Sequence, residues 1–105
     1  MSDIMKELRE EDLLIQAKQD SIQPGDSQSF LESLMERHRL YLKYEDRAFT
    51  AGDISRQSMI NAMKENIFLQ IMIYKLRVEL EGDIAKIFSR LNDQETRIQN
   101  LEQKK

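Results

Sequence analysis

The sequence predicts an all-α fold: a helical hairpin with a long C-terminal coiled-coil helix and an N-terminal helical arm, assembled as an oligomeric helical bundle. Three observations predict this class. The 105 residues include one proline and three glycines, so few positions interrupt a helix. Apolar residues recur three and four positions apart, which is the period of a helix buried on one side. Toward the C-terminus the steps alternate strictly between four and three, as in coiled coils.

The composition limits both the size of the core and the classes of function. A chain of 105 residues forms one domain at most. It contains no cysteine, which excludes disulfide frameworks and thiolate metal sites. Its net charge of -3 gives no general attraction to nucleic acid or anionic lipid. The acidic N-terminus has no apolar signal-peptide core, and no stretch reaches the ~20 apolar residues of a membrane span, so a cytoplasmic location is expected.

Residues 1–23 are predicted to form the helical arm. Lys18 and Glu11 interrupt its apolar stripe, so a docked arm and a partly frayed arm both fit. The stripe consists of Ile4, Leu8, Ile15 and Ile22. Residues 24–28, which contain a Pro-Gly-Asp-Ser sequence, are predicted to be a linker.

Residues 29–81 are predicted to be the hairpin core. Ser29 and Glu32 form a capping-box pattern at the start of a helix that should reach Ala51. Gly52 fits the position after a helix, and Ser55 fits the N-cap of the next one, so the two helices should be antiparallel. The predicted buried face of the first helix comprises Leu31, Leu34, Met35, His38, Tyr41, Leu42, Ala48 and Phe49.

The next helix is apolar on two sides. In residues 67–80, IFLQIMIYKLRVEL, ten of the fourteen residues are apolar. One stripe should pack on the hairpin partner, namely Ile60, Met63, Ile67, Ile71, Tyr74 and Val78. The other stripe, Leu69, Ile73, Leu76 and Leu80, must meet the arm, another copy or a different protein, because one neighbouring helix covers one stripe only.

Residues 82–105 are predicted to extend this helix as a coiled coil. Gly82 falls at the outermost heptad position, so one helix running from Ser55 to about Gln103 is expected, with a kink at Gly82 as the alternative. We call the whole ladder of predicted oligomer contacts the seam: Leu69, Ile73, Leu76, Leu80, Ile84, Ile87, Leu91, Gln94, Ile98 and Leu101.

The charges beside the seam match a parallel pairing of two copies. In that arrangement Arg90 meets Glu95 of the second copy, and Arg97 meets its Glu102. A tail that folds back on the N-terminal helix of its own chain is the alternative.

The sequence holds no pattern of catalytic or cofactor-binding residues. His38 is the single histidine and fits a partly buried helix position, while the acidic residues of the arm fit a solvated helix face: Glu7, Glu10, Glu11 and Asp12. No phosphate loop, nucleophile elbow or metal-ligand spacing is present. We therefore expect no enzyme, no cofactor, no metal and no small-molecule substrate.

The expected function is that of a structural or adaptor protein, a subunit or small chaperone of a larger assembly. Its partners should be other copies of itself and a second protein, and the six methionines fit an adaptable groove for an apolar segment. The alternative is an oligomeric accessory protein that binds single-stranded DNA or RNA. Its candidate contacts are basic residues near Tyr41 and Tyr44, namely Arg37, Arg39, Lys43 and Arg47.

Overall fold

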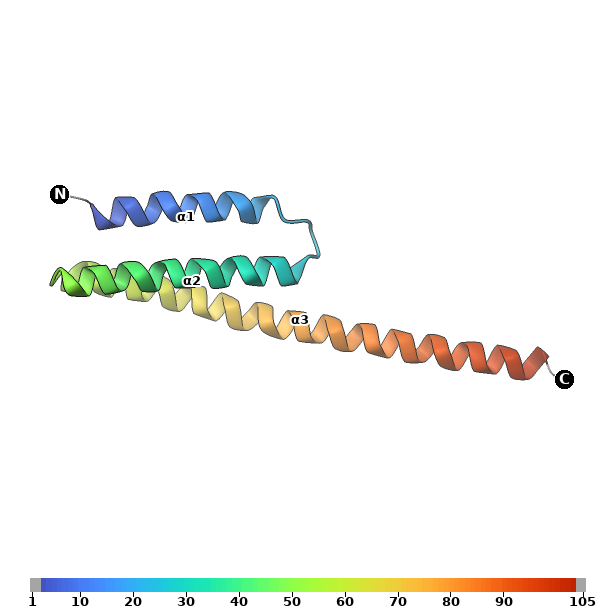
Figure 1. The fold of residues 1–105 in the computed structure, drawn as a ribbon. Coiled ribbons are helices and arrows are strands. Elements are labelled where there is room, and N and C mark those ends of the chain that lie inside the picture. The colour runs from blue at the N-terminus through green and yellow to red at the C-terminus, as the bar shows by residue number, and fades with distance from the viewer. Residues whose placement is uncertain (1–2, 104–105) are drawn as a thin grey trace. The chain divides into compact units, whose positions relative to one another are not determined.

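The computed structural model describes residues 3–103, and all of its regular structure is helical (Figure 1). Helix α1 spans Ile4–Asp20, α2 spans Ser27–Thr50 and α3 spans Ile54–Gln103. The chain divides into two units, residues 1–75 and 76–105, and the division falls within α3. The outer ends of the predicted arm and tail, residues 1–2 and 104–105, lie outside the described residues.

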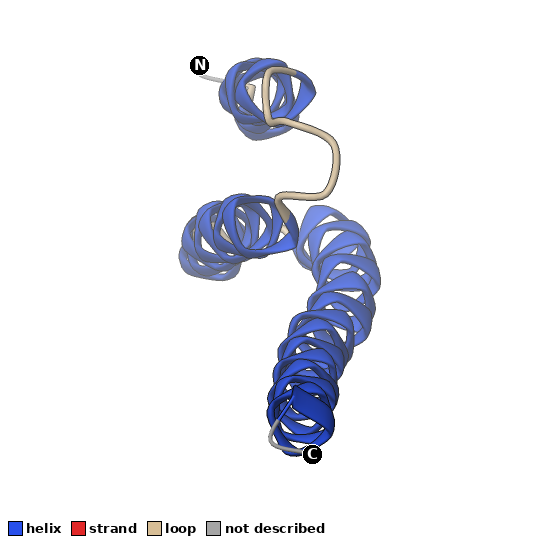
Figure 2. Cartoon of the chain, turned by 90° about the vertical axis from the view of Figure 1, so that its right-hand side faces the viewer, coloured by secondary structure: helices blue, strands red, loops and turns tan. Residues whose placement is uncertain are grey.

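In the first unit, α1 is docked antiparallel on α2 (Figures 1 and 2). The Asp3 carboxylate caps α1 by accepting the backbone N–H groups of Met5 at 3.1 Å and Lys6 at 3.4 Å. The residues that α1 buries are Ile4, Leu8, Asp12 and Ile15. The docked form of the arm is therefore the one that the structure adopts.

The cap of α2 differs from the predicted one. Asp26 is the N-cap, and its carboxylate accepts the Ser29 N–H at 3.1 Å. Gly25, with φ of 90°, turns the chain immediately before this cap. The predicted capping box at Ser29 is therefore wrong: Asp is as good an N-cap as Ser, and here it follows directly on the turn.

The connection between α2 and α3 is a Schellman turn, and the predicted role of Gly52 is confirmed. Gly52 has φ of 72° and donates its N–H to the Phe49 carbonyl at 3.0 Å, while Asp53 donates to the Ala48 carbonyl at 2.9 Å. The Asp53 carboxylate then accepts the Arg56 N–H at 3.1 Å. Because α3 already begins at Ile54, the predicted cap at Ser55 is wrong.

The core of the first unit lies where α2 meets both of its neighbours. Its apolar and aromatic members on α2 are Leu31, Leu34, Tyr41, Tyr44 and Ala48, and those on α3 are Ile60, Ile67 and Ile71. Three residues predicted to belong to this core are outside it: Met35, Leu42 and Phe49 are 37%, 43% and 69% exposed. The buried arc of α2 is shifted toward α1, so that Tyr44 is inside. Met63, predicted to be in the core of α3, is also 41% exposed.

Two further contacts join α2 to α3. The rings of Phe30 and Tyr74 stack with their centroids 4.6 Å apart. The Lys64 ammonium lies 2.6 Å from a carboxylate oxygen of Glu45, and both side chains are mostly buried. Together with the turn at Gly52, these contacts form the predicted antiparallel hairpin.

The second unit is helical from residue 76 to residue 103. The helix continues through Gly82, which confirms the predicted single helix. Apart from the half-buried Val78, every residue described in this unit is exposed. A methyl group added at Gly82 would meet no atom within 4 Å, as expected for a position that faces away from any contact.

Candidate interaction surfaces

A polar cluster built around Asp12 lies between α1 and α2. The Asp12 side chain accepts hydrogen bonds from Arg37 Nε at 2.7 Å and Arg37 Nη2 at 3.1 Å. It also accepts from Tyr41 Oη at 2.6 Å and Gln16 Nε2 at 2.8 Å. Asp12 is 5% exposed, so the predicted solvated position is wrong for this residue. The reason is its place on α1, one turn after Leu8 and one turn before Ile15, on the side that faces α2.

The cluster keeps Asp12 charged and Tyr41 neutral. Burial alone would raise the pKa of the Asp12 carboxyl, but the hydrogen bonds from Arg37, Tyr41 and Gln16 outweigh it and hold the pKa below its ordinary value. Burial and the neighbouring Asp12 carboxylate raise the pKa of Tyr41 to about 12. Because every donor is directed at one carboxylate, the cluster fixes the position of α1 along α2.

Two of the four predicted basic contact residues are held in ion pairs within the first unit. Arg37 is bound to Asp12, and Arg47 Nη1 lies 2.7 Å from Glu7 Oε2. Arg39 and Lys43 are exposed. Tyr41 and Tyr44, the rings expected to stack on bases, are 3% and 2% exposed, so nucleic acid has no access to their faces.

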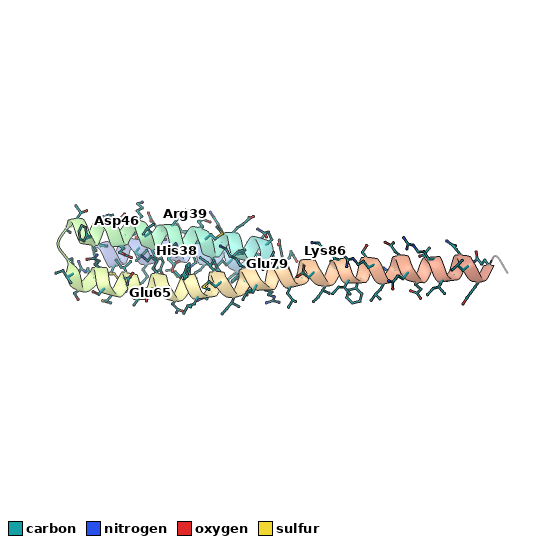
Figure 3. All side chains as sticks on the ribbon, turned by 90° about the horizontal axis from the view of Figure 1, so that it is seen from below. His38, Arg39, Asp46, Glu65, Glu79 and Lys86 are labelled. Atoms are coloured by element: carbon teal, nitrogen blue, oxygen red, sulfur yellow. The ribbon has the colours of Figure 1, made fainter. Side chains whose placement is uncertain are left out.

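His38 is a residue of α2, and its side chain contacts α3 (Figure 3). Its ring is half-buried, and its centroid is 6.0 Å from that of Phe68. Across residues 3–103, no group of three or more His, Cys, Asp or Glu residues is arranged to hold a metal ion. The contact with Phe68 makes His38 part of the surface where α2 and α3 meet.

The seam is exposed along its whole length. Its apolar members are between 42% and 66% exposed, and Gln94 is exposed as well. In the first unit, Leu69 and Ile73 lie on the side of α3 opposite to the buried Ile60, Ile67 and Ile71. The second unit contains the remaining members: Leu76, Leu80, Ile84, Ile87, Leu91, Gln94, Ile98 and Leu101.

No helix between residues 3 and 103 combines the length and the apolar character needed to cross a membrane. No family model, curated protein or solved structure matches this chain.

Proposed function

We propose that this chain is a non-enzymatic structural or adaptor protein that self-associates through the seam and serves as a subunit or small chaperone of a larger assembly. The observation that carries this proposal is the exposed apolar ladder of residues 76–103. It holds seven large apolar side chains, which follow coiled-coil spacing from Leu80 onward, namely Leu76, Leu80, Ile84, Ile87, Leu91, Ile98 and Leu101. An exposed ladder of this kind marks an interaction site, because covering it removes apolar surface from water.

The charges beside the ladder favour a second copy in parallel orientation. Arg90 and Arg97 form no ion pair within the described part of the chain, and neither do Glu95 and Glu102. In a parallel pair, Arg97 of one copy faces Glu102 of the other, and the contact occurs twice. A dimer therefore satisfies the apolar ladder and its flanking charges together.

The proposal is tested by reversing one of these charge pairs. Arg97→Glu should weaken the dimer about fivefold, because two exposed attractive pairs become repulsive at a few tenths of a kcal/mol each. Glu102→Arg in the same chain should restore most of the affinity, and added salt should reduce both effects. Sedimentation equilibrium measures the association.

The matched control is Lys86→Glu, which makes the same change of charge on an exposed residue away from the seam (Figure 3). It should leave the association constant unchanged. Normal assembly of Arg97→Glu, or failure of the double variant to recover, would contradict the parallel pairing. A tail folded back on its own chain has no reason to follow the rescue.

The alternative, an accessory protein for single-stranded nucleic acid, now depends on Arg39 and Lys43. These two residues are exposed on α2 and carry like charges one helical turn apart. Under this alternative, Arg39→Glu combined with Lys43→Glu should abolish binding to a labelled oligonucleotide, and wild-type binding should weaken steeply with salt. Fluorescence anisotropy without any salt-dependent binding by the wild type would exclude it.

A further inference from the structure

The α2–α3 pair carries an apolar surface on the side turned away from α1, which Figure 3 presents to the viewer. We call this surface the hairpin face and define it as Met35, Leu42, Phe49, Phe68 and Met72. These side chains are between 37% and 69% exposed. The three on α2 are spaced seven residues apart and therefore share one side of that helix. The sequence pattern predicts burial of Met35, Leu42 and Phe49, but the first unit leaves them uncovered.

The hairpin face has a shallow cleft at one end and an exposed aromatic ring at the other. A shallow cleft of about 200 Å³ lies between α2 and α3 and is lined by Met35, His38, Arg39, Phe68, Ile71 and Lys75. Phe49 is the most exposed aromatic side chain of the first unit, at 69%. It lies fourteen residues from Met35, roughly 21 Å along α2 at the rise of an α-helix.

Two opposite charges flank the middle of the hairpin face. Arg39 lies three residues before Leu42, and Asp46 lies four residues after it. Both are exposed on α2, and within residues 3–103 neither forms an ion pair (Figure 3). If a second copy lies antiparallel with the two-fold axis near Leu42, Arg39 of each copy meets Asp46 of the other. The same operation places each Phe49 over the cleft beside Met35 of the other copy.

We propose that the hairpin face is an isologous, antiparallel interface with a second copy of this chain, in which Phe49 of each copy enters the cleft of the other. A two-fold contact of this type requires a self-complementary surface. Here a single two-fold axis brings the exposed Phe49 ring to the cleft of the other chain and Arg39 to Asp46 of the other chain. In a parallel arrangement, Arg39 of one chain would lie beside Arg39 of the other, and the two like charges would repel each other. The interface uses none of the side chains of the seam, so it goes beyond the proposed function.

The test uses the full-length chain carrying Leu91→Asp, which disables the seam by placing a carboxylate on its apolar ladder. This variant should still dimerise through the hairpin face when studied by sedimentation equilibrium. Adding Phe49→Ala should weaken that dimer by roughly a hundredfold, because two buried aromatic anchors are lost. Adding Arg39→Asp should weaken it about tenfold, and Asp46→Arg in the same chain should restore the association.

The matched control is Lys86→Asp, which reverses an exposed charge in the second unit, outside the hairpin face, and should leave the dimer unchanged. Circular dichroism checks that each variant stays helical, as expected for substitutions of exposed side chains. A Leu91→Asp chain that is monomeric and helical overturns the hairpin interface, whether or not the seam pairs in the wild type. A charge reversal without rescue also overturns it, as does a mass unaffected by Phe49→Ala.

The masses of four proteins in solution distinguish the two interfaces: the wild type, Leu91→Asp, Phe49→Ala and the double variant. With both intact, the wild type should form species larger than a dimer. Leu91→Asp and Phe49→Ala alone should each give a dimer, and together they should give a monomer. If Phe49→Ala alone gives a dimer while Leu91→Asp gives a monomer, the seam is retained and the hairpin interface is rejected. If Leu91→Asp alone gives a dimer and the wild type is no larger, the proposed function fails and the hairpin interface stands.

Discussion

Removal of the Asp12 carboxylate should destabilise the first unit far more than removal of an equally short surface ion pair. In Asp12→Ala, the Arg37 guanidinium loses its partner, and its side chain is only 15% exposed. The Tyr41 hydroxyl loses its acceptor at the same time, in a side chain with 3% of its surface exposed. A buried charge and a buried donor are thus left together inside the α1–α2 interface.

The expected loss in the free energy of unfolding is about 3 kcal/mol. Removing one partner of a buried ion pair costs about 3–5 kcal/mol, and the lower end applies because Arg37 keeps some contact with water. Glu7→Ala is the matched control. Its partner, Arg47, lies at the same distance of 2.7 Å, but the two side chains are 37% and 39% exposed. An exposed pair contributes far less because water and salt screen it, so burial rather than distance decides the difference.

Urea unfolding followed by circular dichroism at 222 nm measures both losses, at one fixed protein concentration because the chain is proposed to self-associate. Equal losses in Asp12→Ala and Glu7→Ala would refute the reasoning. A further variant separates the lost attraction from the burial of an unpaired charge. Asp12→Leu combined with Arg37→Met should recover part of the stability, since an apolar pair leaves no unpaired charge, while the Tyr41 hydroxyl still lacks its acceptor.

Three further effects are expected. Gly82→Ala should raise the free energy of unfolding by up to about 1 kcal/mol, because alanine favours the helix and its methyl group meets nothing within 4 Å. Gly52→Ala should lower the free energy of unfolding by about 1 kcal/mol, because the backbone φ of 72° disfavours a residue with a Cβ. Thermal melts measure both changes. The pKa of Tyr41 rises from 10.0 in the unfolded chain to about 12 in the folded chain. The contribution of Tyr41 to the free energy of unfolding should therefore be intact below pH 10 and lost as the pH rises through 12. Tyr41→Phe should remove this pH dependence. Because the folded pKa of Asp12 lies below 3.8, its contribution should be intact above pH 3.8 and lost as the pH falls through the lower value, with Asp12→Asn insensitive over that range in acid titrations.

The elements that local sequence determines could be predicted. Gly52 ends α2 because a residue without Cβ is favoured at positive φ, and the structure places it there. The helix continues through Gly82, as the structure shows. A single glycine lowers helix stability by less than the helical turns on either side add to it. The spacing of the seam residues can likewise be read along the chain, while their role in self-association stays a prediction.

The parts that depend on neighbouring helices could not be predicted. Asp12 lies on the buried stripe of α1, one turn from Leu8, but a carboxylate on such a stripe is compatible with burial only when a donor faces it. That donor, Arg37, lies 25 residues away, and no local pattern links the two. Met35, Leu42 and Phe49 fit a buried face by spacing. They are exposed because α1 meets the opposite side of α2 and α3 covers only part of the side that they share, an arrangement set by tertiary contacts.

The Asp12 cluster also explains why α1 leaves the hairpin face open. An arm held by apolar contacts alone could bind either side of the hairpin, because both sides present Met, Leu or aromatic residues. Asp12 makes the choice unequal, since α1 can bury this carboxylate only against the paired donors of Arg37 and Tyr41. The cations at the hairpin face, Arg39 and Lys75, are both exposed, so docking there would pair Asp12 less well than Arg37 and Tyr41 do. The paired charge thus favours one side of the hairpin for α1 and leaves the hairpin face uncovered.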